Sequence, residues 1–218
     1  MKLLESLKLE KVRGFIIILY TVGVIGSAFT ITHDFFIVLT PVVLLLSFAM
    51  LLNFHTPVLD SKTSIVFIII FLISFLVEVA GVKTGQIFGT YSYGRGLGLK
   101  LFDTPLLIGL NWVLLVYCTA VILEKVPVGN IGRIAGASLL MVLYDLVMEQ
   151  VAPRMDMWTF NGGFAPLRNY ISWVILAAIF HSILRMTGIR LTNRLAPMIF
   201  YCQGAFFIIL FIFYKLME

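Results

Sequence analysis

The sequence is poor in charged residues. Only 12% of its 218 residues are Asp, Glu, Lys or Arg, whereas 61% are hydrophobic. A typical soluble domain has about twice that share of charge, so a soluble, disordered, collagen-like or coiled-coil protein is excluded. The net charge of +5 is spread along the chain. It gives no basis for nucleic-acid binding and suits loops that face anionic lipid headgroups. We therefore expect an integral membrane protein.

Cysteine is scarce, and several catalytic motifs are missing. Cys118 and Cys202 lie in apolar runs without the spacing of a metal or redox site. The sequence has no GxSxG, HExxH, phosphate-loop or histidine-rich diiron motif. We therefore expect no metal and no other cofactor. The last apolar run also lacks the deep lysine that a retinal protein needs, because Lys215 lies at its very end.

Long apolar runs are what the sequence has in quantity. About 20 apolar residues cross the hydrocarbon core, and backbone groups in lipid require helices. Seven runs have about this length: 14–31, 35–52, 64–82, 104–123, 131–151, 170–187 and 196–214. The first two are separated only by Thr32, His33 and Asp34, which predicts a tight turn there. We predict an all-α, polytopic bundle of about seven transmembrane helices, forming a single domain over residues 14–218.

The start of the chain and the basic residues indicate the orientation of this bundle. Residues 1–13 place leucines on one side and lysines on the other, which predicts a short amphipathic helix on the membrane surface. With seven spans, ten Lys and Arg residues fall on the N-terminal side and six on the other. This bias predicts a cytoplasmic N-terminus, and we expect the inner (cell) membrane of a bacterium or archaeon.

Acidic residues gather near one face of the predicted bundle. Glu78 lies late in the third run, Asp103 at the start of the fourth, and Asp145 and Glu149 late in the fifth. Ionisable groups inside membrane spans are costly, so each is a candidate functional residue. Asp145 and Glu149 share a helix face at spacing i, i+4. In an apolar interior one of them should hold a proton as a general acid, while its partner could hold a water.

A structural alternative exists for these acids, because they could form ion pairs at the membrane interface. The candidate partners are Arg95, Lys100, Arg154 and Arg168.

Polar and aromatic residues accompany the acids. The glycine-rich segment after the third run carries Tyr91 and Tyr93, and either folds back into the bundle or stays on the surface as a loop. Asn111 and Trp112 lie inside the fourth run. Aromatic faces in such places can steady a cation or hold a flat apolar substrate. Trp158 and Trp173 flank the loop after the fifth run, where tryptophans are usually interfacial anchors.

Three stretches within residues 75–175 resemble the signature of a known family. They are Glu78-x-x-Gly81-x-x-Thr84-Gly85-x-x-Phe88-Gly89-x-Tyr91-x-Tyr93 with Pro105-Leu-Leu-Ile108-x-Leu110-x-Trp112, then Asp145-Leu-x-x-x-Glu149, then Pro166-Leu-x-Asn169-Tyr-x-x-Trp173. These residues are similar to the membrane-embedded carotenoid 1,2-hydratases, a family of carotenoid biosynthesis membrane proteins. The chain departs from the family pattern in the fifth run. It has Glu149-Gln150 where an Asp-Pro is expected, so it keeps the carboxylate but not the helix break.

The resemblance implies a cofactor-independent lyase, a hydratase that adds water to the terminal C1=C2 double bond of an acyclic carotenoid end. A lycopene-like or monocyclic carotene would reach it through the lipid. Proton transfer to C2 gives a tertiary cation at C1, which water captures as a tertiary alcohol. We expect Asp145 to be the acid and Glu149 or Glu78 to hold the water, although the acid and the base can be exchanged. The expected substrate-binding residues are Tyr91, Tyr93, Asp103, Asn111, Trp112, Asn169 and Trp173.

Other functions fit parts of this pattern. A lycopene-cyclase-like enzyme uses the same proton and cation, but an internal double bond captures the cation, so the product gains no water. A non-catalytic carrier of carotenoids or lipids would tolerate amides in place of the acids. A small-solute transporter would need polar residues through the full depth of the bundle and often has inverted repeats, whereas these runs are polar mainly at one end and show no repeat. Nothing in the sequence indicates the oligomeric state.

Overall fold

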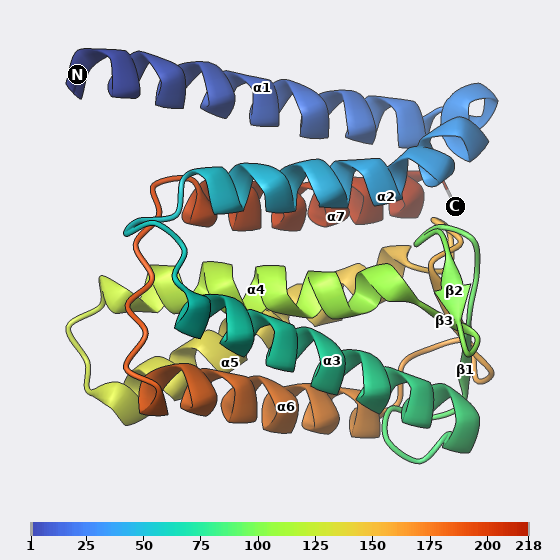
Figure 1. Cartoon of the computed structure of the whole chain (residues 1–218). Helices are drawn as coiled ribbons and strands as arrows, with labels where there is room; N and C mark the ends of the chain where they lie inside the picture. The colour runs from blue at the N-terminus through green and yellow to red at the C-terminus, as the bar shows by residue number, and fades with distance from the viewer. Residues whose placement is uncertain (1, 218) are drawn as a thin grey trace.

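The architecture of the chain, a computed structural model, is a helical bundle. It describes residues 2–217, with side chains from residue 8 onward. This part contains seven helices that are long and apolar enough to cross a membrane, which confirms the predicted fold class. Their bounds are α1 Lys2–Ala28, α2 Thr30–Asn53, α3 Ser61–Thr84, α4 Leu106–Glu124, α5 Asn130–Val151, α6 Leu167–Met186 and α7 Ala196–Leu216. Helix α1 starts at one end of the bundle and α7 finishes at the other (Figure 1).

Helix α1 is continuous from residue 2 and runs through the segment expected to lie on the membrane surface. The side chains of residues 1–7, on which the amphipathic pattern over 1–13 depends, lie outside the described residues. A separate surface helix there stays a prediction.

The turn between the first two spans is not where the apolar runs place it. The break falls at Phe29, and Thr32 and His33 already belong to α2. The Thr32 hydroxyl donates to the carbonyl of Gly26 at 2.7 Å, and the His33 ring is 2.7 Å from the carbonyl of Ser27. These polar side chains satisfy the last carbonyls of α1, which have no partner within their own helix. They therefore cap one helix from within the next and do not form the turn.

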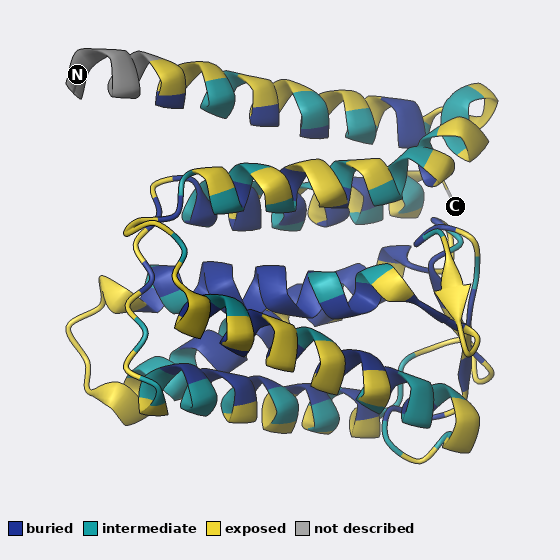
Figure 2. Cartoon of the chain, in the orientation of Figure 1, coloured by how far each residue is buried: buried dark blue, intermediate teal, exposed yellow. Residues whose placement is uncertain are grey.

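Helix α4 is the centre of the bundle. In its membrane window 72% of the residues are buried, against 17–39% in the other six helices, and Figure 2 shows its ribbon almost wholly in the buried colour. It packs against α2, α3, α5, α6 and α7. Helix α1 lies at the edge of the bundle, where it packs against α2 and α7 (Figure 1).

The ends of the helices follow local chemistry. The side chain of Asp60 accepts from the backbone N–H of Thr63 at 2.8 Å and caps the start of α3. Gly85 ends that helix with φ of 64°, a left-handed conformation that suits glycine. Pro105 and Pro166 stand directly before α4 and α6, where a residue without an N–H removes no helical hydrogen bond.

Two small antiparallel sheets cover the end of the bundle where α3 ends and α4 begins (Figure 1). The strands β1 (Tyr91–Tyr93) and β4 (Trp158–Phe160) pair with Tyr93 opposite Trp158. The strands β2 (Lys100–Leu101) and β3 (Thr104–Pro105) form the other sheet. Strand side chains alternate between the two faces, so Tyr91, Tyr93, Trp158 and Phe160 are buried while the residues between them are exposed. The segment after α3 therefore folds back onto the bundle.

Candidate active site

The structure places the predicted acids in two environments at the β1–β4 end of the bundle. Glu78 on α3 and Asp145 and Glu149 on α5 are buried, with 4%, 0% and 9% of their surfaces exposed. Asp103 lies instead in the exposed turn between β2 and β3, with φ of 64°. Asp156 pairs with Arg95 at 3.1 Å near the surface. Glu78, Asp145 and Glu149 are thus the acids of the interior.

Glu78 is held by three donors. Its Oε2 accepts from the hydroxyls of Tyr91 at 2.7 Å and Tyr93 at 2.8 Å, and its Oε1 accepts from the indole N–H of Trp112 at 3.1 Å. Burial, followed by the nearby Glu78 carboxylate, raises the pKa of both tyrosines above its ordinary value, so they keep the protons that they donate. Trp112 is fully buried and stacks on Trp173 with the ring centres 4.2 Å apart.

Asp145 and Glu149 are joined by one amide. The Nδ2 of Asn169, on α6, donates to Asp145 Oδ2 at 2.8 Å and to Glu149 Oε1 at 3.2 Å. Glu149 Oε2 accepts from the indole N–H of Trp158 at 2.9 Å. Among the described side chains, the buried Oδ1 of Asp145 has no hydrogen-bond partner. The i, i+4 pair therefore shares one face and one neutral donor.

The basic residues considered as partners bind elsewhere. Arg95 contacts Asp34 and Asp156. Lys100 donates to the carbonyl of Tyr93, and Arg168 to the carbonyls of Gly85 and Gln86. Arg154 lies over the ring of Tyr214. Among the described side chains, the hydrogen-bond donors to the three buried acids are thus tyrosine, tryptophan and asparagine. The same part of the chain has no group of three or more His, Cys, Asp or Glu placed to hold a metal ion.

A small void lies between the two groups of acids. Its volume is about 20 Å³, and a void of about 10–15 Å³ accepts one water molecule if polar groups surround it. The void is lined by Glu78, Phe88, Tyr91, Tyr93, Glu149, Trp158, Phe160, Asn169 and Trp173. Four of these are predicted substrate-binding residues and two are predicted catalytic residues. The lining does not include Asp145, which is linked to Glu149 through the side chain of Asn169.

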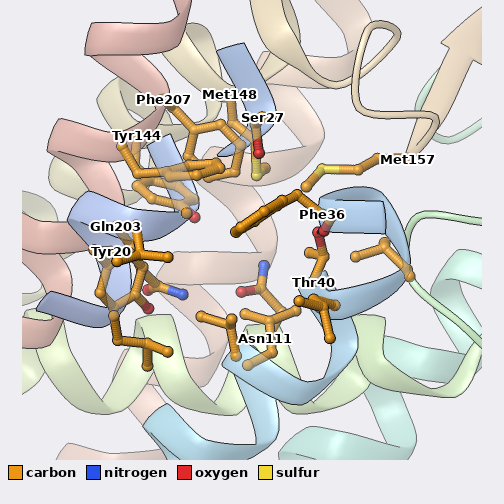
Figure 3. Close-up of a pocket in the computed structure, with 18 of the residues that line it drawn as sticks. Tyr20, Ser27, Phe36, Thr40, Asn111, Tyr144, Met148, Met157, Gln203 and Phe207 are labelled. Carbon is orange, nitrogen blue, oxygen red and sulfur yellow. The ribbon is translucent and has the colours of Figure 1, made fainter. Parts of the chain in front are cut away.

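A second, larger cavity is almost entirely apolar. Its volume is about 330 Å³, at the lower end of the range for small-molecule sites. Its lining comes from α1, α2, α4, α5 and α7 and from the segments beside β4 (Figure 3). Val22 and Phe35 belong to the lining and are 48% and 63% exposed. Because they lie on the outer helices α1 and α2, the cavity opens toward the lipid.

Trp158 lines both the void and the cavity, and its indole N–H donates to Glu149. Its place in the sequence predicts only an interfacial anchor. The signal that could have placed Trp158 at the site is the alternation of Trp158-Thr159-Phe160, but three residues are too few to predict a strand. Asn111 lines the cavity as well, whereas Trp112 lines neither space and instead contacts Glu78 and Trp173.

The backbone around Trp158 is tightly fitted. The N–H of Gly94 donates to the carbonyl of Met157 at 2.9 Å. A Cβ atom on Gly94 would lie 2.3 Å from the carbonyl oxygen of Asp156, so only glycine lets the two segments approach this closely. This contact fixes β4, and with it Trp158, against the segment that follows β1.

Comparison with known proteins identifies the family. The sequence model of the family described as "Carotenoid biosynthesis protein" matches residues 39–217. The chain belongs to this family.

The carotenoid biosynthesis match includes all three buried acids and both short sheets but leaves out α1 and the first residues of α2. One relative is the bisanhydrobacterioruberin hydratase of Haloarcula japonica, which is 28% identical over 134 residues. That alignment covers 56% of this chain and 45% of the relative, so the chain spans less than half the length of the curated protein that it matches. No solved structure matches the chain.

Proposed function

We propose that this carotenoid biosynthesis protein is a carotenoid 1,2-hydratase. The observation that carries the proposal is a void for one water molecule, bordered by Glu78 and Glu149, that shares the lining residue Trp158 with an apolar cavity open to lipid. Rotation of the Trp158 side chain would bring an alkene in the cavity and a water in the void together beside Glu149. The name of the Haloarcula relative, a hydratase, agrees with this reaction class.

The larger cavity suits one end of a long polyene. Its lining has no Asp, Glu, Lys or Arg. The entry of an apolar chain therefore does not remove water from a charged side chain, which would be costly. Because the cavity opens beside the exposed Val22 and Phe35, the rest of the polyene can remain in the bilayer. The end group then lies against Trp158.

Glu149 is the group best placed to protonate the substrate. It borders the void and accepts from Trp158, whereas Asp145 lines neither the void nor the cavity. Two carboxyl groups joined by one amide in an apolar interior favour a state with one proton between them. We assign that proton to Glu149, whereas the sequence favours Asp145 as the acid. Asp145 then serves as the ionised neighbour that keeps the proton on Glu149 until the substrate binds.

Proton transfer from Glu149 to C2 of the terminal double bond leaves a tertiary cation at C1. The indole of Trp158 lies between the cavity and Glu149 and offers an aromatic face to this cation. Tyr93 lies edge-on to Trp158, with the ring centres 6.0 Å apart, and supports that orientation.

Water capture completes the reaction. Once the Trp158 side chain has turned aside, a water in the void donates to Glu78 while its lone pair attacks C1, and the proton it loses passes to Glu78. That proton returns to the Asp145–Glu149 pair through the hydrogen-bonding groups that line the void. One alkene and one water give one tertiary alcohol, and no net proton is consumed.

Product analysis tests the proposal. The chain is expressed in cells that make lycopene or a monocyclic carotene, and the extracted pigments are measured by mass spectrometry and absorption. We expect a mass gain of one water with an unchanged chromophore. An unchanged mass with a shortened chromophore indicates the cyclase alternative. Co-purified but unaltered pigment indicates the carrier.

Filling the cavity should abolish substrate binding. Gly23, on α1, lines the cavity, and a Cβ there would make an ordinary 3.4 Å contact with the ring of Phe206. A leucine at this position therefore extends into the space that the end group needs. We expect Gly23→Leu to reduce conversion at least tenfold, and Gly204→Leu, where a Cβ meets nothing within 4 Å, to leave it unchanged. Equal conversion by both variants would reject the cavity as the binding site.

The proposal also covers the side of the membrane on which the site lies. We propose that the N-terminus is cytoplasmic and that the β1–β4 end faces the opposite side of a bacterial or archaeal cell membrane. Labelling of single cysteines placed at Asp103 and at Lys125 with a membrane-impermeant reagent distinguishes the two faces.

A further inference from the structure

The hairpin formed by β2 and β3 carries large apolar side chains on its outer surface. Leu99, Leu101 and Phe102 are 83%, 47% and 57% exposed. They belong to five consecutive exposed residues, 99–103, which we call the hairpin tip. Figure 2 shows β2 in the exposed colour at the end of the bundle. These three side chains are not part of the hydrophobic core of the described chain.

The turn of this hairpin is strained. Phe102 and Asp103 are its two central residues, between the paired Leu101 and Thr104. Their φ angles are 53° and 64°. A two-residue turn with two positive φ angles favours Asn and Gly, and a bulky residue in this conformation is rare and costly. Because phenylalanine weakens the turn, its side chain needs a role outside the hairpin.

Two lysines accompany the apolar side chains. Lys83, in the last turn of α3, places its Nζ 5.1 Å from the centre of the Phe102 ring. Lys100, in β2, donates to the carbonyl of Tyr93. Each ammonium group has three donors, so one contact within the chain leaves others for an anion. Apolar side chains and positive charge thus occur together beside the end of a membrane-spanning helix.

We propose that the hairpin tip docks on the lipid leaflet at the β1–β4 end of the bundle. Leu99, Leu101 and Phe102 then lie at the boundary of the acyl chains. Lys83 and Lys100 bind the phosphates of anionic headgroups. Segments that lie in the membrane interface combine apolar and basic side chains in this way, because lysine keeps its stem in apolar surroundings while its charged end reaches the headgroups.

The position of the hairpin agrees with this depth. Lys83 stands one residue before the end of α3, and the hairpin leads directly into α4 at Leu106. Gly98, just before the tip, lies against α2, since a Cβ there would be 3.1 Å from Cγ of Pro41. The hairpin therefore lies beside the spans, near the level where α3 ends and α4 begins.

A second copy of the chain suits this surface less well than lipid does. A stable protein interface takes about 20–30 residues from each side, whereas the tip offers three exposed apolar side chains. The two lysines outnumber the one carboxylate of the tip, Asp103. Two such positive tips would repel each other across a twofold axis, but an anionic leaflet attracts them. This docking does not depend on the proposed reaction.

Photo-crosslinking tests the proposal in the full chain. Benzoylphenylalanine replaces Phe102 in one variant and Ser92, an exposed residue of β1, in a control. Both variants are placed in nanodiscs of phosphatidylcholine and phosphatidylglycerol, irradiated and analysed by intact mass. We expect lipid adducts at position 102 with about ten times the yield at position 92, because only the hairpin tip reaches the acyl chains.

The composition of the adducts tests the lysines. We expect phosphatidylglycerol to be about threefold enriched in the adducts relative to its share of the nanodisc. Lys83→Gln combined with Lys100→Gln should abolish this enrichment and leave the total yield of lipid adducts unchanged. Lys62→Gln, at an exposed lysine at the opposite end of α3, should keep the enrichment.

Three results would contradict the proposal. Equal lipid yields at positions 102 and 92 would show that the tip does not enter the leaflet. Adducts that join two protein chains would make a second copy the occupant of this surface. Adducts that match the lipid mixture before any lysine is replaced would show that the tip does not select anionic headgroups.

Discussion

Glu149→Gln should reduce hydration by a factor of about 100 to 10,000, the usual contribution of a general acid. Glutamine has nearly the same shape but no proton of suitable acidity to give to the alkene. It keeps one acceptor for either Asn169 or Trp158, whose donors are 3.2 and 2.9 Å from the carboxylate. The other buried donor is left unpaired, which costs about 1–3 kcal/mol, less than the usual stability of a folded protein, so the variant should remain folded. The measurement is the yield of hydrated carotenoid per amount of purified protein.

Two further substitutions make this result decisive. Asp34→Asn removes an exposed acid that pairs with Arg95 on the same face of the bundle, and it should leave conversion unchanged. Asp145→Asn tests the exchanged assignment, because it removes the acid that the sequence favours as donor. Full activity of Glu149→Gln together with loss of activity in Asp145→Asn would move the proton to Asp145. Full activity of both would remove the pair from the mechanism.

Glu78→Leu should strongly destabilise the fold. The hydroxyls of Tyr91 and Tyr93 and the indole N–H of Trp112 all donate to this carboxylate, and leucine accepts none of them. Buried donors without partners cost about 1–3 kcal/mol each, so we expect a loss of about 3 kcal/mol or more. For a chain of this length that lowers the unfolding midpoint by roughly 6–12 °C.

Thermal unfolding in detergent, followed by tryptophan fluorescence, measures this effect. Glu78→Gln keeps one acceptor oxygen and should fall between the unaltered chain and Glu78→Leu. A Glu78→Leu variant with an unchanged midpoint would show that the three donors find other partners, and that Glu78 does not hold the β1 strand against α3.

The spans were predictable from the sequence because they depend on one property, the length of apolar runs. The fourth run, 104–123, corresponds to α4 at Leu106–Glu124, and the third, 64–82, to α3 at Ser61–Thr84. Hydropathy does not show, however, which side chains form hydrogen bonds with the ends of a helix. The turn near Thr32 was therefore placed a few residues too late, since that side chain bonds back to the carbonyl of Gly26.

The candidate site was predictable only in part. The i, i+4 spacing put Asp145 and Glu149 on one face, but the bridge between them comes from Asn169 on another helix. The position of Trp158 depends on a strand of three residues paired with a segment about 65 residues earlier in the chain. The cavity arises where α1, α2 and α7 meet, and no local pattern of residues encodes such a space.

The family match begins at residue 39, and this boundary separates the buried acids from part of the cavity wall. The acids and Trp158 fall within residues 39–217, whereas Tyr20, Gly23 and Phe36, which line the cavity, come before residue 39. Under the proposed function, the catalytic groups and one wall of the binding space lie in separate stretches of sequence. A chimera that carries a relative's first helix on this chain's remaining helices should therefore keep the reaction and change only the shape of that wall.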